Sequence, residues 1–157
     1  MNSSDVSSSS DTAELSTIDM ALEVVQLPVS DVDRAKRFYQ GLGWRFDIDL
    51  VVSDDVRTVQ MTPPHSACSI QFGKGGTTAE PGSVQGTILV VSDIDAARDD
   101  LVRRGVEVSE VRAQRPPGFD ASAGRSYFAR ASFSDPDGNG WVLQEVTTRL
   151  PGREWQD

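Results

Sequence analysis

Apolar side chains recur at two different spacings along the chain, and these spacings predict where helices and strands lie. Over residues 32–42 and 94–101 they return every three or four positions, which is the spacing of an amphipathic helix. The two stripes consist of Val32, Ala35, Phe38, Tyr39 and Leu42, and of Ile94, Ala97 and Leu101. We therefore predict one helix in each half of the chain.

Short runs rich in apolar, β-branched and aromatic residues surround these helices and predict strands. One run precedes each helix, at residues 22–29 and 87–91. Three runs follow each helix, at residues 44–51, 56–62 and 69–72 in the first half and 107–111, 127–133 and 141–147 in the second. Each half of the chain is therefore predicted to be a β-α-β-β-β unit.

The two halves repeat one another. Residues 27–43 and 89–105 align without a gap at an offset of 62. In both copies a Ser-Asp pair offers side-chain oxygens to cap the helix start, and a glycine stands where the helix ends. Self-similarity at one fixed offset indicates two copies of a single structural unit.

The stretch "SFSDPDGNGWVLQEV", residues 132–146, contains the first half of a calcium-loop pattern in Asp135, Asp137 and Asn139. A calcium loop of this kind needs a bidentate glutamate at its twelfth position, where this chain has Val146. The flanking residues resemble strands, and Pro-Asp-Gly-Asn is typical of a turn. We predict a strand–turn–strand hairpin here and no calcium site.

Composition limits the classes of function. The net charge of −9 argues against a nucleic-acid-binding protein, which needs a basic face. No apolar run approaches the length of a membrane span, and the N-terminus lacks the basic and apolar segments of a signal peptide. The single cysteine, Cys68, excludes an internal disulfide and fits a reducing cytoplasm. A cytoplasmic location is therefore expected.

The length of 157 residues suits one domain. Residues 1–19 are rich in serine and acidic residues, so they are predicted to be a disordered extension. The domain is expected over residues 20–150, with modules at about 20–73 and 86–148, a linker at 74–85 and a tail at 151–157.

The chain resembles the vicinal oxygen chelate superfamily in its two copies of a strand followed by a helix capped by "SD", in "FY…LG" at the end of the first helix, and in a single terminal "DPDGN" hairpin. That superfamily includes glyoxalase I, extradiol dioxygenases, methylmalonyl-CoA epimerase and bleomycin-resistance proteins. The resemblance covers residues 20–150. It implies an α+β fold in which two tandem βαβββ modules form a curved eight-stranded mixed sheet around a cavity, with helices outside, in a homodimer.

The resemblance also implies four positions for metal ligands, one on each of four strands. Carried over by position, these are Val24, Thr87, Gln71 and Val142. Valine has no donor atom, and Thr and Gln are weak ligands for a catalytic divalent ion. An extradiol dioxygenase needs two histidines, and His65 is the only one in the chain. We expect no metal and no other cofactor, and predict that the four positions line a ligand cavity instead.

Other residues are candidates for ligand binding. Trp44 could line an apolar pocket, although tryptophan is more often part of the core. Residues 111–126 are rich in Gly, Pro, Ala and Ser, and form either a flexible insertion or a lid over the cavity. In the second case Arg112, Arg115 and Arg125 could contact an anionic ligand.

Catalytic candidates are weak. His65 is more plausible as an exposed turn residue than as a general base, because Pro-rich connections run over the surface. Glu145 is either a solvated strand residue, the preferred interpretation, or an inward-facing base whose pKa burial would raise. Tyr127 is a third candidate, and Cys68 is better explained as a small packed thiol.

These residues favour a metal-independent protein that binds a small organic molecule in its sheet cavity. This resembles the bleomycin-resistance branch, where sequestration gives protection and an acidic groove suits a cationic drug. The alternatives are a lyase or isomerase of the glyoxalase type that uses acid–base residues or an atypical metal site, and a module that binds a partner through its dimer surface. No nucleic acid or membrane partner is expected.

Overall fold

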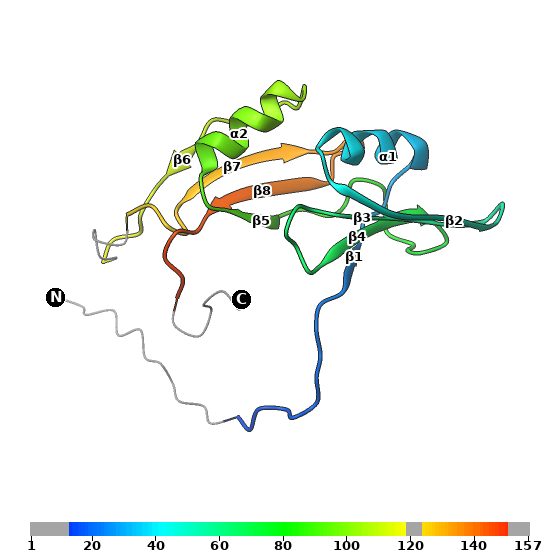
Figure 1. Cartoon of the computed structure of the whole chain (residues 1–157), viewed down its shortest axis with the longest axis horizontal. Helices are drawn as coiled ribbons and strands as arrows, with labels where there is room; N and C mark the ends of the chain where they lie inside the picture. The colour runs from blue at the N-terminus through cyan, green and yellow to red at the C-terminus, as the bar shows by residue number, and fades with distance from the viewer. Residues whose placement is uncertain (1–12, 119–123, 151–157) are drawn as a thin grey trace.

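The structure is a computed structural model that describes residues 13–118 and 124–150 (Figure 1). The first module consists of β1 (Val24–Gln26), α1 (Val32–Gly41), β2 (Arg45–Ser53), β3 (Val56–Thr62) and β4 (Ser69–Lys74). The second consists of β5 (Thr87–Val91), α2 (Ile94–Arg103), β6 (Arg112–Ala113), β7 (Ala129–Ser134) and β8 (Gly140–Glu145). The predicted βαβββ order is confirmed in both halves.

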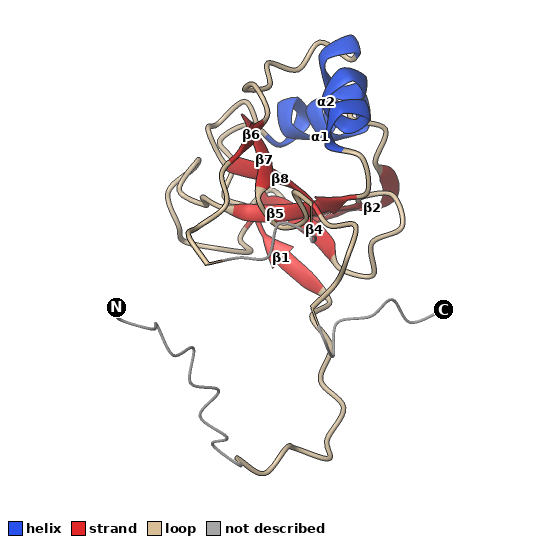
Figure 2. Ribbon diagram, turned by 90° about the vertical axis from the view of Figure 1, so that its left-hand side faces the viewer, coloured by secondary structure: helices blue, strands red, loops and turns tan. Residues whose placement is uncertain are grey.

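Each module forms its own four-stranded mixed sheet. The strand orders are β1-β4-β3-β2 and β5-β8-β7-β6, so both sheets have the same topology. The first strand of each module runs parallel to the last, and the remaining pairs are antiparallel. Both helices lie on one side of the strands, as Figure 2 shows. The fold is thus α+β with tandem modules, and its eight described strands are divided between two sheets.

The helix boundaries follow from local hydrogen bonds. Asp31 and Asp93 both have extended backbone angles, and their carboxylates accept 3.0 Å hydrogen bonds from the N–H groups of Arg34 and Ala96. Beyond the two helices, Gly43 and Gly105 have φ of 81° and 88°, where a side chain would be strained. The predicted caps and stops are confirmed.

Two predicted strands differ from the structure. Residues 107–111 form no strand, and the pairing with β7 is made by β6 at residues 112–113. The Ser109 hydroxyl accepts the Ser132 N–H at 2.9 Å, so a side chain replaces a ladder carbonyl there. Tyr127 was expected within a strand but lies in a turn before β7, with φ of 69°.

The core extends across both modules. Tyr39 of α1, Trp44 and Trp141 of β8 pack with ring centroids 5.2 to 6.1 Å apart, and all three are buried. Val59, Met61, Phe72 and Ile94 are also almost fully buried. Because aromatic rings from both modules meet there, neither module has a separate core.

The face of each sheet turned away from the helices is here called the open face. Alternation along a strand sends one set of side chains to the core and the next to the open face. On β2, Ile48 and Leu50 pair with Gln60 and Thr58, opposite to the buried side of β3. On β5, Ile88 and Val90 are likewise exposed. The open faces therefore carry apolar side chains in solvent.

No helix in the described ranges combines the length and apolar content needed to cross a bilayer. The predicted disordered extension falls mainly on residues 1–12, and the predicted tail is residues 151–157; both lie outside the described residues. Residues 13–23 contain no helix or strand.

Candidate functional site

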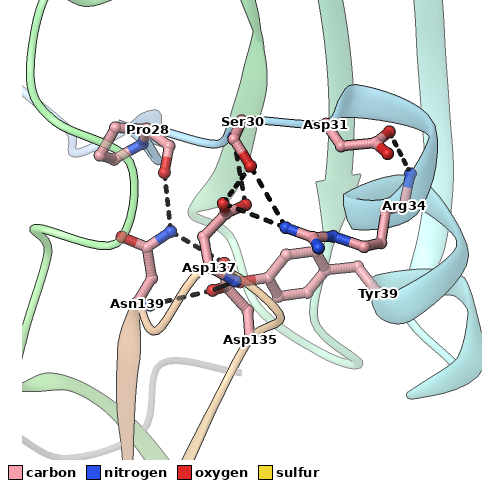
Figure 3. A network of polar contacts seen from close by, with 8 residues as sticks. All are labelled: Pro28, Ser30, Asp31, Arg34, Tyr39, Asp135, Asp137 and Asn139. Atoms are coloured by element: carbon pink, nitrogen blue, oxygen red, sulfur yellow. Dashed lines mark hydrogen bonds and ion pairs between the residues drawn. The ribbon is translucent and has the colours of Figure 1, made fainter.

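The "DPDGN" hairpin between β7 and β8 joins the two modules (Figure 3). Asp135 is buried, and its carboxylate accepts hydrogen bonds from the Tyr39 hydroxyl at 2.9 Å and from the Asn139 amide at 2.8 Å. Asn139 also donates to the Pro28 carbonyl at 2.9 Å. Burial and the Asp135 charge raise the pKa of Tyr39 far above its ordinary value, so its proton stays in place.

A second carboxylate, whose side chain is only 6% exposed, extends the connection. Asp137 accepts a 3.2 Å hydrogen bond from the Ser30 N–H and another from the Ser30 hydroxyl. Arg34 of α1 forms an ion pair with Asp137 at 3.2 Å. The turn predicted from "DPDGN" is confirmed, and its polar residues have a role that its sequence did not indicate: they hold the second module against the first helix.

The four positions carried over as metal ligands are divided between two sheets, and one of them lies on the core side. Val24 and Gln71 lie on the open face of the first sheet, and Val142 lies on that of the second. Thr87 is the pairing partner of Trp141, whose ring is buried in the core. Thr87 therefore lies on the core side of its sheet, opposite to the open face that carries Val142.

The donor chemistry at these positions does not fit a divalent metal ion. Gln71, the best donor among them, already donates to Gln60 at 2.8 Å and accepts from Gln26 at 2.7 Å. Within residues 13–118 and 124–150, no cluster of three or more His, Cys, Asp or Glu side chains could hold a metal ion. The residues therefore do not match the ligand set that the resemblance implied.

Gln71 belongs to a row of hydrogen-bonded side chains across the first sheet, here called the amide ladder: Gln26, Gln71, Gln60 and Asp47. Asp47 ends the row and accepts from Gln60, Thr62 and Arg45. The hydrogen bond from the Arg45 guanidinium contributes most to lowering the pKa of Asp47 to about 2. The polar groups of the ladder thus satisfy one another.

The open face of the second sheet carries a cleft of about 660 Å³, here called the β7 cleft. Its lining is mostly apolar and consists of Arg112, Gln114, Pro116, Ser126, Tyr127, Phe128, Arg130, Gln144, Thr148, Arg149 and Leu150. This volume lies in the range of pockets that hold small organic ligands.

Hydrogen bonds fix the walls of the β7 cleft. The buried Gln144 amide donates to the Tyr127 carbonyl at 2.9 Å, which stabilises the left-handed backbone at that residue. The Tyr127 hydroxyl accepts the Leu150 N–H at 3.1 Å, and the Ser126 hydroxyl accepts the Thr148 N–H at 3.1 Å. The segment after β8 is therefore held against the turn before β7, and the space between them forms the cleft.

Glu145 does not face the β7 cleft. The preferred expectation of a solvated side chain was wrong: it is 5% exposed and lies on the helix side of β8, with Trp141 and Leu143. Its carboxylate accepts the Ile94 N–H at 3.0 Å, at the start of α2, and pairs with Arg125 at 2.9 Å. Glu145 and Arg125 therefore both stabilise the start of α2.

Arg125 was a candidate for ligand binding, but its guanidinium is held by Glu145 and by Asp95 at 2.8 Å. These two carboxylates raise the pKa of Arg125, so it stays charged and paired. Of the three arginines named in the predicted lid, only Arg112 lines the β7 cleft. Part of that predicted lid, residues 119–123, lies outside the described residues.

The remaining candidates lie apart from the β7 cleft. Trp44 is buried in the aromatic core. His65 is exposed in a turn with φ of 61°. Cys68 is half-buried, and burial raises the pKa of its thiol. Val142 lines a different cavity of about 550 Å³, between the β7–β8 hairpin and residues 105–107.

Known families and structures agree with this fold. The sequence model of the Glyoxalase/Bleomycin resistance protein/Dioxygenase superfamily matches residues 21–143. The chain belongs to this superfamily. No curated protein matches the chain.

Solved structures of the superfamily resemble the chain over most of its length. TnmS3, an antibiotic binding protein from Streptomyces sp. CB03234, is 29% identical with a TM-score of 0.66, over 84% of this chain and 99% of that one. A glyoxalase/bleomycin resistance protein from the same organism is 30% identical with a TM-score of 0.62, over 79% and 99%. A superfamily member from Sphaerobacter thermophilus is 27% identical with a TM-score of 0.63, over 81% and 98%.

Within this superfamily fold, sequence reasoning missed two cleft residues that matter. Gln144 was expected near the cavity only if the last strand were shifted by one residue, and Arg130 was not named as a binding residue. Arg130 stands between two buried alanines, Ala129 and Ala131, so strand alternation placed it on the open face. The alternation of buried and exposed residues was the sequence signal for Arg130. The sequence does not show, however, which residue of the neighbouring strand is paired with it.

Proposed function

We propose that the chain binds a small organic molecule in the β7 cleft without a metal ion, and that it sequesters this molecule unchanged. The observation that carries the proposal is the cleft itself, which combines apolar walls with a few fixed polar groups. The superfamily membership and the likeness to an antibiotic binding protein support a small-molecule ligand. The poor donor set at Val24, Thr87, Gln71 and Val142 supports binding without a metal.

A thermal-shift screen of apolar and aromatic small molecules, antibiotics included, tests this proposal. A molecule that binds only the folded chain raises its unfolding temperature. We expect Leu150→Asp, which places a charge on the cleft wall, to weaken binding of a hit at least about tenfold. Val102→Asp is the matched control, because Val102 is similarly exposed but lies on α2. Equal binding by the two variants would contradict the proposed location.

Metal independence has a separate test. We expect elemental analysis of protein purified without chelator to show no stoichiometric Zn, Ni, Mn or Fe. We also expect the affinity for a hit to be unchanged by a strong chelator. One tightly held ion per chain, with binding lost on chelation, would refute this part of the proposal.

A homodimer is part of the proposal, because the open faces expose apolar side chains. Leu50 on β2 is 49% exposed, and Ile88 on β5 is 45% exposed. A second copy packed on these strands would remove that area from water. Analytical ultracentrifugation should find a dimer, and Leu50→Arg should shift it towards monomer. Monomeric wild-type protein at micromolar concentration would contradict this arrangement.

A lyase or isomerase of the glyoxalase type is the second candidate, favoured by the place of Tyr127. Of the three catalytic candidates, only Tyr127 lines the β7 cleft. Its hydroxyl accepts from Leu150 and can still donate its proton to a bound molecule. Turnover of a hit that Tyr127→Phe abolishes without loss of binding would favour the enzyme. Binding without turnover favours sequestration.

A further inference from the structure

We infer that the β7 cleft selects molecules that pair an apolar or aromatic body with a negatively charged group, held by Arg112 and Arg130. This inference rests on the proposed function and names the chemical class of the ligand. It reverses the expectation of an acidic groove for a cationic drug.

The two arginines are direct neighbours. Arg112 on β6 and Arg130 on β7 are partners in the antiparallel pairing, and both line the β7 cleft. Side chains at paired positions lie close together, and two like charges at such a pair destabilise a sheet. An anion placed between the two guanidinium groups would turn this repulsion into attraction.

Neither arginine has an acceptor within the described residues, although the chain is acidic. Six other arginines in the described chain pair with carboxylates: Arg34, Arg45, Arg57, Arg103, Arg104 and Arg125. Arg98 donates to the carbonyls of Val108 and Ser109. With 24 acidic and 15 basic residues, carboxylates outnumber cations. Arg37 and Arg115 also lack a partner among the described residues, but only Arg112 and Arg130 of these four stand opposite one another at a cleft.

Among the described residues, the cleft lining contains no acidic side chain. The acidic side chain of the adjoining strand, Glu145, is buried on the other face and occupied by Arg125 and the start of α2. Within the part of the chain that the structure describes, the β7 cleft is therefore a positive spot on a negative protein.

The shape of these groups defines the ligand further. Guanidinium groups bind carboxylates, sulfonates and phosphates through paired N–H donors. Tyr127, Phe128 and Leu150 provide an apolar wall beside them. A flat aromatic molecule with an acidic group at one edge matches both parts of the cleft.

Two fluorescent dyes with one carbon skeleton test this inference. The anionic probe is 8-anilino-1-naphthalenesulfonate, and the neutral probe is N-phenyl-1-naphthylamine, which lacks the sulfonate. We expect the anionic dye to bind about tenfold more tightly, because hydrogen bonds to charged groups are worth more than neutral contacts. Added salt should weaken its binding and leave that of the neutral dye unchanged.

The Arg112→Gln, Arg130→Gln double variant should lose about tenfold in affinity for the anionic dye and keep its affinity for the neutral one. The matched control is Arg37→Gln, Arg103→Gln, which removes the same charge from the exposed surfaces of α1 and α2. We expect this control to bind both dyes as the wild type does. Unfolding temperatures of both variants check that they are folded.

The outcomes separate the inference from the proposed function. If the neutral dye binds as tightly as the anionic one, without salt dependence, the charge selection is overturned and the cleft proposal stands. The same holds if the double variant and the control bind the anionic dye equally. If neither dye binds the wild type, the proposed apolar site itself is overturned. The salt series needs no variant, so it decides the question even if the double variant does not fold.

Discussion

The open faces of the two sheets come from the same βαβββ unit but carry different chemistry. On the first sheet, the amide ladder joins Gln26, Gln71, Gln60 and Asp47, and each side chain is the partner of the next. On the second sheet, Arg112 and Arg130 lie beside an apolar cleft, with no acceptor among the described residues. The backbone is repeated, whereas the pairing of polar groups is not.

This difference separates polar groups that stabilise the protein from those that can recognise a ligand. A hydrogen bond already made inside the protein must be broken before a ligand can replace it. The amide ladder would therefore bind a ligand at the cost of its own contacts. The two cleft arginines have no partner to give up among the described residues, which is why we propose the second sheet as the binding surface.

The largest effect is expected at the joint between the two modules. Asp135→Ala leaves the Tyr39 hydroxyl and the Asn139 amide without their buried acceptor. We expect the free energy of unfolding to fall by about 3 kcal/mol, measured by urea denaturation with tryptophan fluorescence. Asp99→Ala on the exposed side of α2 is the control, with a change within about 0.5 kcal/mol. Equal midpoints for the two variants would show that the hairpin does not hold the modules together.

A smaller loss is expected from Glu145→Ala, which removes the acceptor of the Ile94 N–H and the partner of Arg125. We expect the free energy of unfolding to fall by about 2 kcal/mol, against almost no change for the exposed Glu110→Ala. Affinity of the folded variant for a cleft ligand should remain unchanged. A variant of wild-type stability that has lost turnover of a ligand would instead identify Glu145 as a catalytic base.

Asp47 of the amide ladder allows the comparison of the two sheets to be tested through the pH dependence of stability. Its pKa is lowered from 3.8 to about 2 in the folded chain, chiefly by Arg45, so its ion pair stabilises the fold above pH 4. This stabilisation is lost as pH falls from about 4 to about 2, because the unfolded chain takes up the proton first. We expect Asp47→Asn to remove about 1 kcal/mol at pH 7, allowing for solvent screening, and to flatten the acid limb of the stability curve.

The control for this titration is Asp54→Asn, in the exposed turn between β2 and β3. It should leave the acid limb as steep as in the wild type. Urea midpoints measured from pH 2 to pH 7 provide the comparison. Parallel curves for Asp47→Asn and the wild type would mean that the carboxylate of the amide ladder contributes nothing to folding.

The smallest effect is expected from Gln71→Ala within the amide ladder. Its partners Gln26 and Gln60 are not fully buried and can turn to water, so the free energy of unfolding should fall by only about 0.5 kcal/mol. Dye binding in the β7 cleft should not change. If Gln71→Ala weakens dye binding more than Leu150→Asp does, the ligand occupies the first sheet and the comparison fails.

Much of the fold was predictable because its signals are local. The caps at Asp31 and Asp93 bond to N–H groups three residues away, and the stops at Gly43 and Gly105 need only a left-handed backbone. Such contacts depend only on residues that are close along the chain. The repeat at offset 62 therefore shows the same pattern in both halves of the sequence. The expected strand at 107–111 was different, because Ser109 contacts β7 through one backbone and one side-chain hydrogen bond, both to Ser132, which is distant in the sequence.

The candidate site was less predictable. Strand alternation alone places Glu145 on the same side as Trp141 and Leu143, so its burial could have been predicted from the apolar pattern. The sequence could not show whether the Glu145 carboxylate would bind the start of a helix or a ligand, because α2 begins 51 residues earlier in the chain. The same limit applies to Asp135, whose partner Tyr39 is 96 residues away.

The sequence by itself determined the repeated unit, the helix boundaries and the terminal hairpin, since each arises from residues that are close along the chain. Only the tertiary structure decided which polar groups meet, because those pairs depend on strand register and on how the two modules pack. It joined the hairpin carboxylates to the first module and Arg125 to Glu145. It also set Arg112 against Arg130 beside an apolar cleft, where neither charge has an acceptor among the described residues.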